Sequence, residues 1–124
     1  MSAKTILYVE DNATNRRIVR DLLQRTTYRL IEAPDGEAGV ATALEIRPDL
    51  ILMDIQLPKI SGIEAMRRLR AEPSMAATPI IAITSFALSG DDQKAKGAGA
   101  TAYIAKPYSP RDLLALIRKT LPEA

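Results

Sequence analysis

The residues from Asp49 to Pro58 constrain the fold more than any other part of the chain. An unbroken aliphatic run from Leu50 to Met53 is followed there by a carboxylate, Asp54, shortly before a proline. A run without polar alternation is typical of a strand buried on both faces, as in a parallel sheet that helices cover. Because ligands of such sheets bind beyond the carboxyl ends of the strands, Asp54 is the first candidate for a functional residue.

Length and composition limit the class of protein. The 124 residues predict one domain, residues 1–124, large enough for a core without disulfides. The sequence has no cysteine, which excludes thiolate metal sites, and no histidine, so any phosphohistidine must belong to a partner. The apolar run near the N-terminus is too short for a signal peptide or a membrane span. We expect a soluble cytoplasmic protein.

The charge pattern does not favour a nucleic-acid partner. The net charge is only +2, the 17 basic residues are interleaved with 15 acidic ones, and aromatic residues for base stacking are scarce. The two tightest basic groups have helical spacing; they are Arg16, Arg17 and Arg20, and Arg67, Arg68 and Arg70. They are expected to form solvated faces of helices.

Five strands are predicted to alternate with five helices. The strands are expected at residues 4–9, 28–33, 49–54, 79–84 and 102–105. Helices are expected at 13–25, 37–46, 62–71, 89–99 and 110–121, with Asn12, Ser61 and Ser109 as N-caps. The helix at 89–99 has only small apolar residues and an internal glycine, which predicts a short, weakly anchored element. This alternation predicts βαβ units, a parallel sheet in the order 2-1-3-4-5 and a three-layer α/β sandwich.

Three carboxylates are predicted to meet at one edge of this sheet. Glu10 and Asp11 end the first strand and Asp54 ends the third, and in the predicted order these strands are neighbours about 4.8 Å apart. Carboxylates this close repel one another unless a proton or a cation is bound. Oxygen ligands without histidine or cysteine select a hard divalent ion such as Mg²⁺. The ion would screen the charge of an incoming phosphoryl group, which makes Asp54 a candidate nucleophile.

Two further polar residues end the other strands of this edge. Thr84 ends the fourth strand and Lys106 follows the fifth, and two strand spacings are about 9.6 Å, within reach of a lysine side chain from Asp54. A hydroxyl and an ammonium group can both bind phosphoryl oxygens. Each residue alone has an ordinary alternative, such as a turn-forming aspartate, a capping threonine or a solvated lysine. Their joint position at the strand ends favours a phosphoryl-transfer site.

Over its whole length the chain resembles the receiver domains of bacterial two-component response regulators. The residues that carry the resemblance are Val9-Glu10-Asp11-Asn12, Leu52-Met53-Asp54-Ile55-Gln56-Leu57-Pro58 with Ser61-Gly62, Ile83-Thr84, and Tyr103-Ile104-Ala105-Lys106-Pro107. In this family, which has a flavodoxin-like fold, a histidine kinase or a histidine phosphotransfer protein supplies a phosphoryl group. The receiver catalyses the transfer to its own aspartate with Mg²⁺.

The resemblance assigns roles at the carboxylate cluster. It implies that Asp54 is the phosphoacceptor and that Glu10, Asp11 and Asp54 bind Mg²⁺ together with the backbone carbonyl of Gln56. The expected function is a phosphorylation-activated signalling switch of a two-component phosphorelay. Such a protein is not an enzyme in the usual sense, because it catalyses only its own phosphorylation and dephosphorylation.

The resemblance also implies a switch on the opposite flank. Lys106 and Thr84 would bind the phosphoryl group, and family members usually have a cis peptide bond before the proline that matches Pro107. Thr84 would move toward the phosphoryl group and let Tyr103 turn inward, which changes the surface of the fourth helix, fifth strand and fifth helix. The alternative for Tyr103 is an ordinary half-buried strand tyrosine.

The implied partners are proteins. A sensor histidine kinase or a histidine phosphotransfer protein would donate the phosphoryl group, and a downstream protein target would receive the signal, because no output domain is expected after the receiver. Neither nucleic acid nor a membrane is expected as a direct partner. A homodimer through the fourth helix, fifth strand and fifth helix is a further expectation. The chain looks most like stand-alone single-domain regulators of the cell-division type and like receivers attached to hybrid kinases.

Two other functions remain open from the sequence. A magnesium-dependent phosphatase for small molecules would use the same aspartyl-phosphate chemistry, but it would need an acidic residue in place of Gln56 and a cap insertion. A phosphorylation-independent interaction module would keep the fold with a vestigial pocket, although the acidic pair, the aspartate, the threonine and the lysine are all present. Nucleotide binding is least favoured, because no glycine-rich loop follows the first strand.

Overall fold

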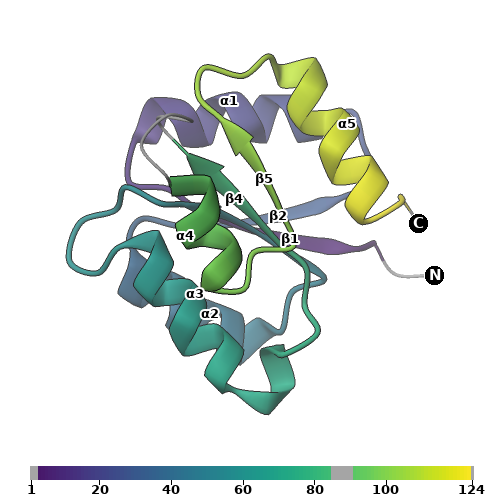
Figure 1. The fold of residues 1–124 in the computed structure, drawn as a ribbon. Helices are drawn as coiled ribbons and strands as arrows, with labels where there is room; N and C mark the ends of the chain where they lie inside the picture. The colour runs from purple at the N-terminus through teal and green to yellow at the C-terminus, as the bar shows by residue number, and fades with distance from the viewer. Residues whose placement is uncertain (1–2, 85–90, 124) are drawn as a thin grey trace.

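One five-stranded parallel sheet forms the centre of the molecule (Figure 1). The computed structural model describes residues 3–84 and 91–123, and the strand order β2-β1-β3-β4-β5 is the predicted one. The strands are β1 (Thr5–Val9), β2 (Arg29–Ala33), β3 (Leu50–Asp54), β4 (Ile80–Thr84) and β5 (Ala102–Ala105). The predicted strand positions are therefore confirmed to within one residue at each end.

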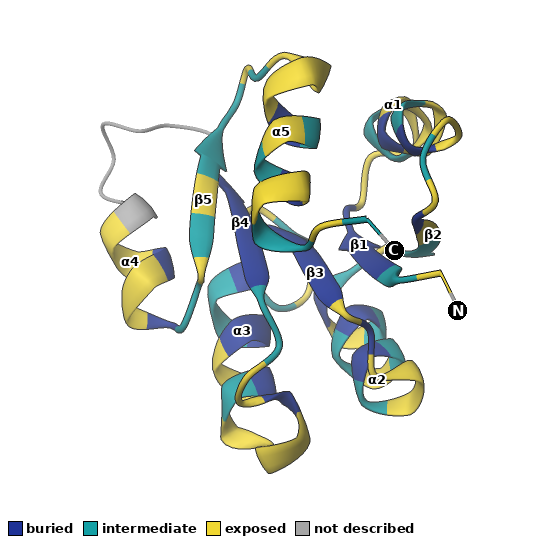
Figure 2. Ribbon diagram, turned by 90° about the vertical axis from the view of Figure 1, so that its right-hand side faces the viewer, coloured by how far each residue is buried: buried dark blue, intermediate teal, exposed yellow. Residues whose placement is uncertain are grey.

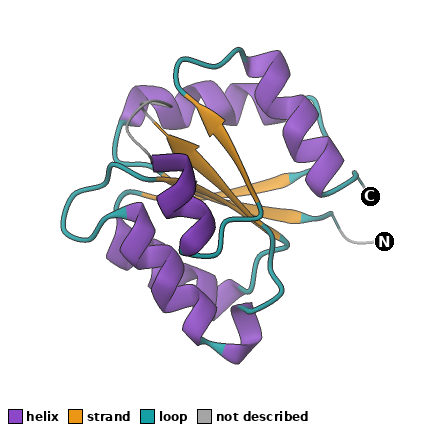
Figure 3. Cartoon of the chain, in the orientation of Figure 1, coloured by secondary structure: helices purple, strands orange, loops and turns teal. Residues whose placement is uncertain are grey.

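Helices cover both faces of the sheet and complete the three-layer α/β sandwich (Figure 3). One face carries α1 (Ala13–Leu23) and α5 (Pro110–Thr120), and the other carries α2 (Gly36–Ile46), α3 (Gly62–Ala71) and α4 (Asp91–Gly97). A short 3-10 helix, η1 (Pro73–Met75), joins α3 to β4 and was not predicted. The flavodoxin-like architecture is confirmed.

Side-chain caps set where the helices begin. The side chains of Asn12, Ser61 and Ser109 accept hydrogen bonds from backbone amides three residues further on, at 3.0, 3.1 and 3.0 Å. These are the three predicted N-caps, and Asp35 caps α2 in the same way. The loop from β1 to α1 is therefore short, at residues 10–12, while the loop from β3 to α3 covers residues 55–61.

The central strands are buried on both sides, and the edge strands are not (Figure 2). Every residue of β3 and β4 is buried, whereas β2 and β5 contain partly exposed residues. Along β1, Leu7 and Val9 pack under α2 and α3, and Ile6 and Tyr8 pack under α1 and α5. The aliphatic runs lack polar alternation because both faces of these strands meet helices.

The fourth helix is short, as predicted. It spans Asp91–Gly97, while a helix was predicted at 89–99, and residues 85–90 lie outside the described part of the chain. Among its described residues the helix contacts the core through Ala95, and Ala98 does so directly after its end; a Cβ added at Gly97 would meet no described atom within 4 Å. Small side chains bury little apolar area, so the hydrophobic contribution that holds α4 to the sheet is small.

Arg70 departs from the predicted solvated face of α3. Its two basic neighbours on the helix are exposed, but Arg70 is partly buried and donates to backbone carbonyls of Gly99 at 2.9 and 2.8 Å, Met75 at 2.7 Å and Thr78 at 2.6 Å. Burial lowers the pKa of Arg70. Helical spacing predicted that these arginines lie along α3, but it could not predict that loops fold over Arg70. Arg70 thereby ties the end of α3 to the turn before β5.

Candidate functional site

Polar side chains from four strands lie at the carboxyl edge of the sheet. The parallel register makes β1 and β3 end side by side, which places Glu10 at the level of Asp54. Strands β4 and β5 also end together, which places Lys106 one residue beyond the partner of Thr84. The strand order therefore brings together residues that are far apart in the sequence.

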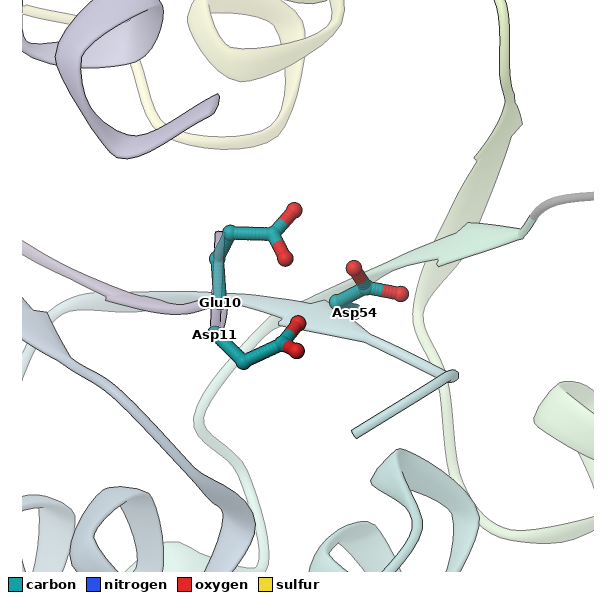
Figure 4. Close-up of side chains that lie close together, drawn as sticks. All are labelled: Glu10, Asp11 and Asp54. Carbon is teal, nitrogen blue, oxygen red and sulfur yellow. The ribbon is translucent and has the colours of Figure 1, made fainter. Parts of the chain in front are cut away.

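Glu10, Asp11 and Asp54 converge, with the first two reaching toward the third (Figure 4). One carboxylate oxygen from each residue lies within 4.8 Å of the others. The side chains of Glu10 and Asp54 are almost fully buried, while Asp11 is exposed at the mouth of the cluster. Partial desolvation, together with the adjacent Glu10 carboxyl, raises the pKa of Asp11. This direction is expected where like charges are held together.

Lys106 supplies the positive charge of the cluster. Its Nζ lies 2.9 Å from Asp54 Oδ2 and 3.2 Å from Glu10 Oε1. Burial alone would lower the pKa of Lys106, but the hydrogen bonds and charges of Asp54 and Glu10 outweigh it, and the net pKa is raised. The ammonium group is therefore charged at neutral pH. The peptide bond between Lys106 and Pro107 is cis, as the resemblance implied.

The backbone after β3 folds back over Asp54. The amide of Gln56 donates to Asp54 Oδ1 at 3.0 Å, and the amide of Gly62 donates to the carbonyl of Ile55 at 2.9 Å. A Cβ on Gly62 would lie only 2.1 Å from the carbonyl oxygen of Asp54. The start of α3 therefore packs directly against the residue that carries the candidate nucleophile, and only glycine leaves room for this approach.

Thr84 has a buried hydroxyl without a hydrogen-bond partner among the described residues. The residue is fully buried at the end of β4, and its Oγ1 makes no hydrogen bond to any described residue. An unpaired buried hydroxyl costs about 1–3 kcal/mol, and such groups in native structures call for an explanation. A ligand oxygen arriving at this edge of the sheet would supply the missing partner.

Tyr103 lies on the outer side of β5. Its side chain is 39% exposed, and Lys96 Nζ of α4 lies 5.5 Å from the ring centroid, within cation–π range. The structure therefore places Tyr103 outside the cluster rather than beside Thr84.

Sequence reasoning missed three polar residues beside the cluster: Tyr8, Asn15 and Tyr108. The Tyr8 hydroxyl donates to Glu10 Oε1 at 3.3 Å, and Asn15 Nδ2 donates to the same oxygen at 3.1 Å. Burial is the main cause that raises the pKa of both Tyr8 and Tyr108, which also interact through their hydroxyls. The available signal was the spacing of two residues between Tyr8 in β1 and Glu10 directly after it, which puts both side chains on the same side of the extended backbone.

A cavity of about 480 Å³ opens next to the cluster. It is lined by residues of α1 and of the segment that leads from β5 into α5: Asn15, Ile18, Lys106, Pro107, Tyr108 and Pro110. Ile18 is 45% exposed although it is a large aliphatic residue. The surface that a partner or ligand would meet next to Lys106 is therefore mostly apolar.

The donor set fits a hard divalent cation. Three carboxylates against one ammonium group leave the cluster with an excess of negative charge, and all of the acidic ligands offer oxygen. Mg²⁺ typically takes one or two carboxylates, keeps several waters and binds a phosphate oxygen, and the exposed position of Asp11 leaves space for water. The residues present can thus hold Mg²⁺ beside Asp54.

Comparison with known proteins identifies the family. The model of the response regulator receiver domain matches residues 6–118. This chain belongs to the response regulator receiver domain family. The polar-differentiation response regulator DivK of Brucella anthropi is 40% identical over 121 residues, which are 98% of this chain and 98% of that protein.

Solved receiver structures agree with the fold. The chemotaxis response regulator CheY4 of Vibrio cholerae superposes with a TM-score of 0.91 at 30% identity, covering 97% of this chain and 100% of that one. The receiver domain of the sensor histidine kinase PA1611 of Pseudomonas aeruginosa has a TM-score of 0.88 at 36% identity, covering 95% of this chain and 97% of that domain. That structure has a magnesium ion coordinated in its active-site cleft.

Membership of the family settles the type of activity. The receiver domain is a phosphorylation switch of two-component signal transduction, not a conventional enzyme, and its phosphodonor is a histidine kinase. Receiver domains bind Mg²⁺ in an acidic active site, and the acidic cluster of Glu10, Asp11 and Asp54 is suited to hold such an ion. Within residues 3–84 and 91–123, no helix is long and apolar enough to cross a membrane.

Proposed function

We propose that Asp54 is the phosphoacceptor of this receiver and that Glu10, Asp11 and Asp54 hold Mg²⁺ with the backbone carbonyl of Gln56. The observation that carries the proposal is the meeting of three carboxylates with the Lys106 ammonium group, 2.9 Å from Asp54. Asp54 lies at the centre of this group, and it is the residue that both the cation-binding carboxylates and the lysine face.

The chemistry is a displacement at phosphorus. An oxygen of Asp54 forms a bond to the phosphorus of the partner's phosphohistidine, the P–N bond breaks, and its electron pair stays on the imidazole nitrogen. Bound Mg²⁺ supplies positive charge next to the phosphoryl oxygens. Lys106 faces the same region, and its ammonium group stabilises negative charge on the transferred group. The Gln56 amide keeps the Asp54 carboxylate oriented through Oδ1.

The switch would start at Thr84. Its unpaired hydroxyl gains a hydrogen-bond partner when it donates to a phosphoryl oxygen, which favours movement of Thr84 toward Asp54. The space that Thr84 leaves allows Tyr103 to turn inward and give up its contact with Lys96. The changed surface comprises α4, β5 and α5, and the small buried contacts of α4 suit an element that shifts.

Signal output is proposed to be by protein contact. The chain would act as a single receiver domain of residues 1–124 in the cytoplasm, and its likeness to a DivK regulator over 98% of both chains supports this form. The donor would be a sensor histidine kinase or a histidine phosphotransfer protein. A downstream protein target would bind the altered surface. A homodimer would form through the same surface of α4, β5 and α5.

The proposal is tested by intact mass spectrometry after incubation with phosphoramidate. With Mg²⁺ the wild-type chain is expected to gain the mass of one phosphoryl group. The gain should disappear when a chelator removes the metal, because the carboxylate cluster then repels the anionic donor. No gain at any Mg²⁺ concentration would contradict the proposal and favour a phosphorylation-independent interaction module.

Lys106→Ala is expected to keep phosphorylation but to slow it roughly 100-fold, the usual loss when one group that stabilises transition-state charge is removed. The variant also leaves Glu10 and Asp54 without their shared cation. Mg²⁺ should therefore raise its thermal unfolding temperature by more than it raises that of the wild type. Mass spectrometry of samples quenched at a series of times measures the rate, and thermal unfolding scans measure the effect of Mg²⁺. The control is Lys119→Ala, on the exposed side of α5. A wild-type rate for Lys106→Ala would remove Lys106 from the proposed site.

A further inference from the structure

Tyr8 places a phenol within the apolar core. It is fully buried on the face of β1 that packs under α1 and α5, among aliphatic residues that include Ile6, Val19 and Leu52. A buried tyrosine hydroxyl usually finds a hydrogen-bond partner, because an unpaired one is costly. The Tyr8 hydroxyl donates to Glu10, which lies two residues further along the same face of the strand.

The two carboxylate oxygens of Glu10 have different surroundings. Oε1 accepts from the Tyr8 hydroxyl at 3.3 Å, from Asn15 Nδ2 at 3.1 Å and from Lys106 Nζ at 3.2 Å. Among the described residues, Oε2 accepts only from the amide of Asn12, at 3.3 Å. A carboxylate has about four lone-pair sites over its two oxygens, so three donors occupy Oε1 fully. Oε2 is the oxygen with capacity left for a cation.

We infer that Tyr8 and Asn15 are positioning residues that hold Glu10 with Oε2 toward the cation site. The inference rests on the proposed function, in which Glu10 is a magnesium ligand. Neither Tyr8 nor Asn15 needs to touch the metal or the phosphoryl group. They act by fixing the rotation of the Glu10 carboxylate, and groups that orient metal ligands in this way change metal affinity when they are removed. Mg²⁺ is sensitive to such orientation because it demands near-octahedral geometry.

The test is the Mg²⁺ affinity of Tyr8→Phe, measured on the full chain by amide NMR titration with MgCl₂. The substitution removes only the hydroxyl and keeps the ring that fills the core. The dissociation constant is expected to rise about tenfold, and Asn15→Ala should raise it similarly. Tyr28→Phe is the matched control, because it also removes a buried hydroxyl, one that donates to the Leu121 carbonyl far from the cluster.

Phosphorylation by phosphoramidate gives the second measurement. In Tyr8→Phe the Mg²⁺ concentration for half-maximal rate should rise with the dissociation constant, while the rate at saturating Mg²⁺ stays within about twofold of wild type, since the reacting groups are unchanged. Wild-type affinity in Tyr8→Phe, or an equal loss in Tyr28→Phe, would overturn the inference. A Tyr8-dependent Mg²⁺ affinity in a chain that takes up no phosphoryl group would support the inference and contradict the proposed function instead.

Discussion

Asp54→Asn is expected to take up no phosphoryl group from phosphoramidate at any Mg²⁺ concentration. An amide oxygen lacks the negative charge that makes a carboxylate a nucleophile, and the acyl phosphate proposed for Asp54 has no counterpart on asparagine. Intact mass spectrometry should show the unmodified chain alone. The matched control is Asp49→Asn, at the other end of β3, where the carboxylate accepts only from the backbone amide of Thr5 at 2.8 Å among the described residues.

The loss in Asp54→Asn should reflect chemistry and not unfolding. Asparagine retains an oxygen for the hydrogen bond from Gln56, and Lys106 keeps Glu10 as a partner. Removing one of three clustered carboxylates also relieves like-charge repulsion. The free energy of unfolding without metal is therefore expected to stay within about 1 kcal/mol of wild type, as denaturant titration can measure. Undiminished labelling of Asp54→Asn would mean that another residue accepts the phosphoryl group.

Most of the fold could be predicted because local signals agree with one another. The mainly aliphatic strands that end at Val9, Asp54 and Thr84 need helices on both faces, and the caps at Asn12 and Ser61 mark where two of those helices begin. Features that depend on the path of a loop could not be predicted from the sequence. The 3-10 helix η1 and the carbonyl contacts of Arg70 arise from how the segment after α3 folds back, and no periodicity encodes that path.

The candidate site divides in the same way. The carboxylates and Lys106 could be placed from strand order alone, since each ends a strand or follows the end of one. The hydrogen bonds that orient these side chains could not be predicted, because from the sequence Tyr8 is interpreted as an ordinary aromatic residue of a buried strand. The unpaired hydroxyl of Thr84 is likewise a property of the folded chain. The part played by the Gln56 carbonyl stays a prediction, as does the inward turn of Tyr103.

The glycine at the start of α3 should be nearly irreplaceable. In Gly62→Ala the new Cβ would lie 2.1 Å from the Asp54 carbonyl oxygen and 2.7 Å from the Ile55 Cα, both backbone atoms of a fully buried strand end. Neither can move without disturbing β3, so the whole start of α3 must shift. Overpacking of this kind costs typically about 1–3 kcal/mol and occasionally more, and we expect about 3 kcal/mol here.

Gly97→Ala provides the control with the opposite sign. A Cβ at Gly97 would meet no described atom within 4 Å, and the residue lies at the end of α4 without a positive φ angle. Because the full glycine penalty applies to helix interiors, alanine at this last helical position should raise the free energy of unfolding by at most about 0.5 kcal/mol. Urea titration of both variants separates the two effects. Because α3 packs against Asp54 itself, Gly62→Ala should also slow phosphorylation in the fraction that remains folded. If the two variants were equally stable, the prediction would be wrong, because the β3–α3 connection would then accommodate a Cβ at Gly62 without a loss of stability.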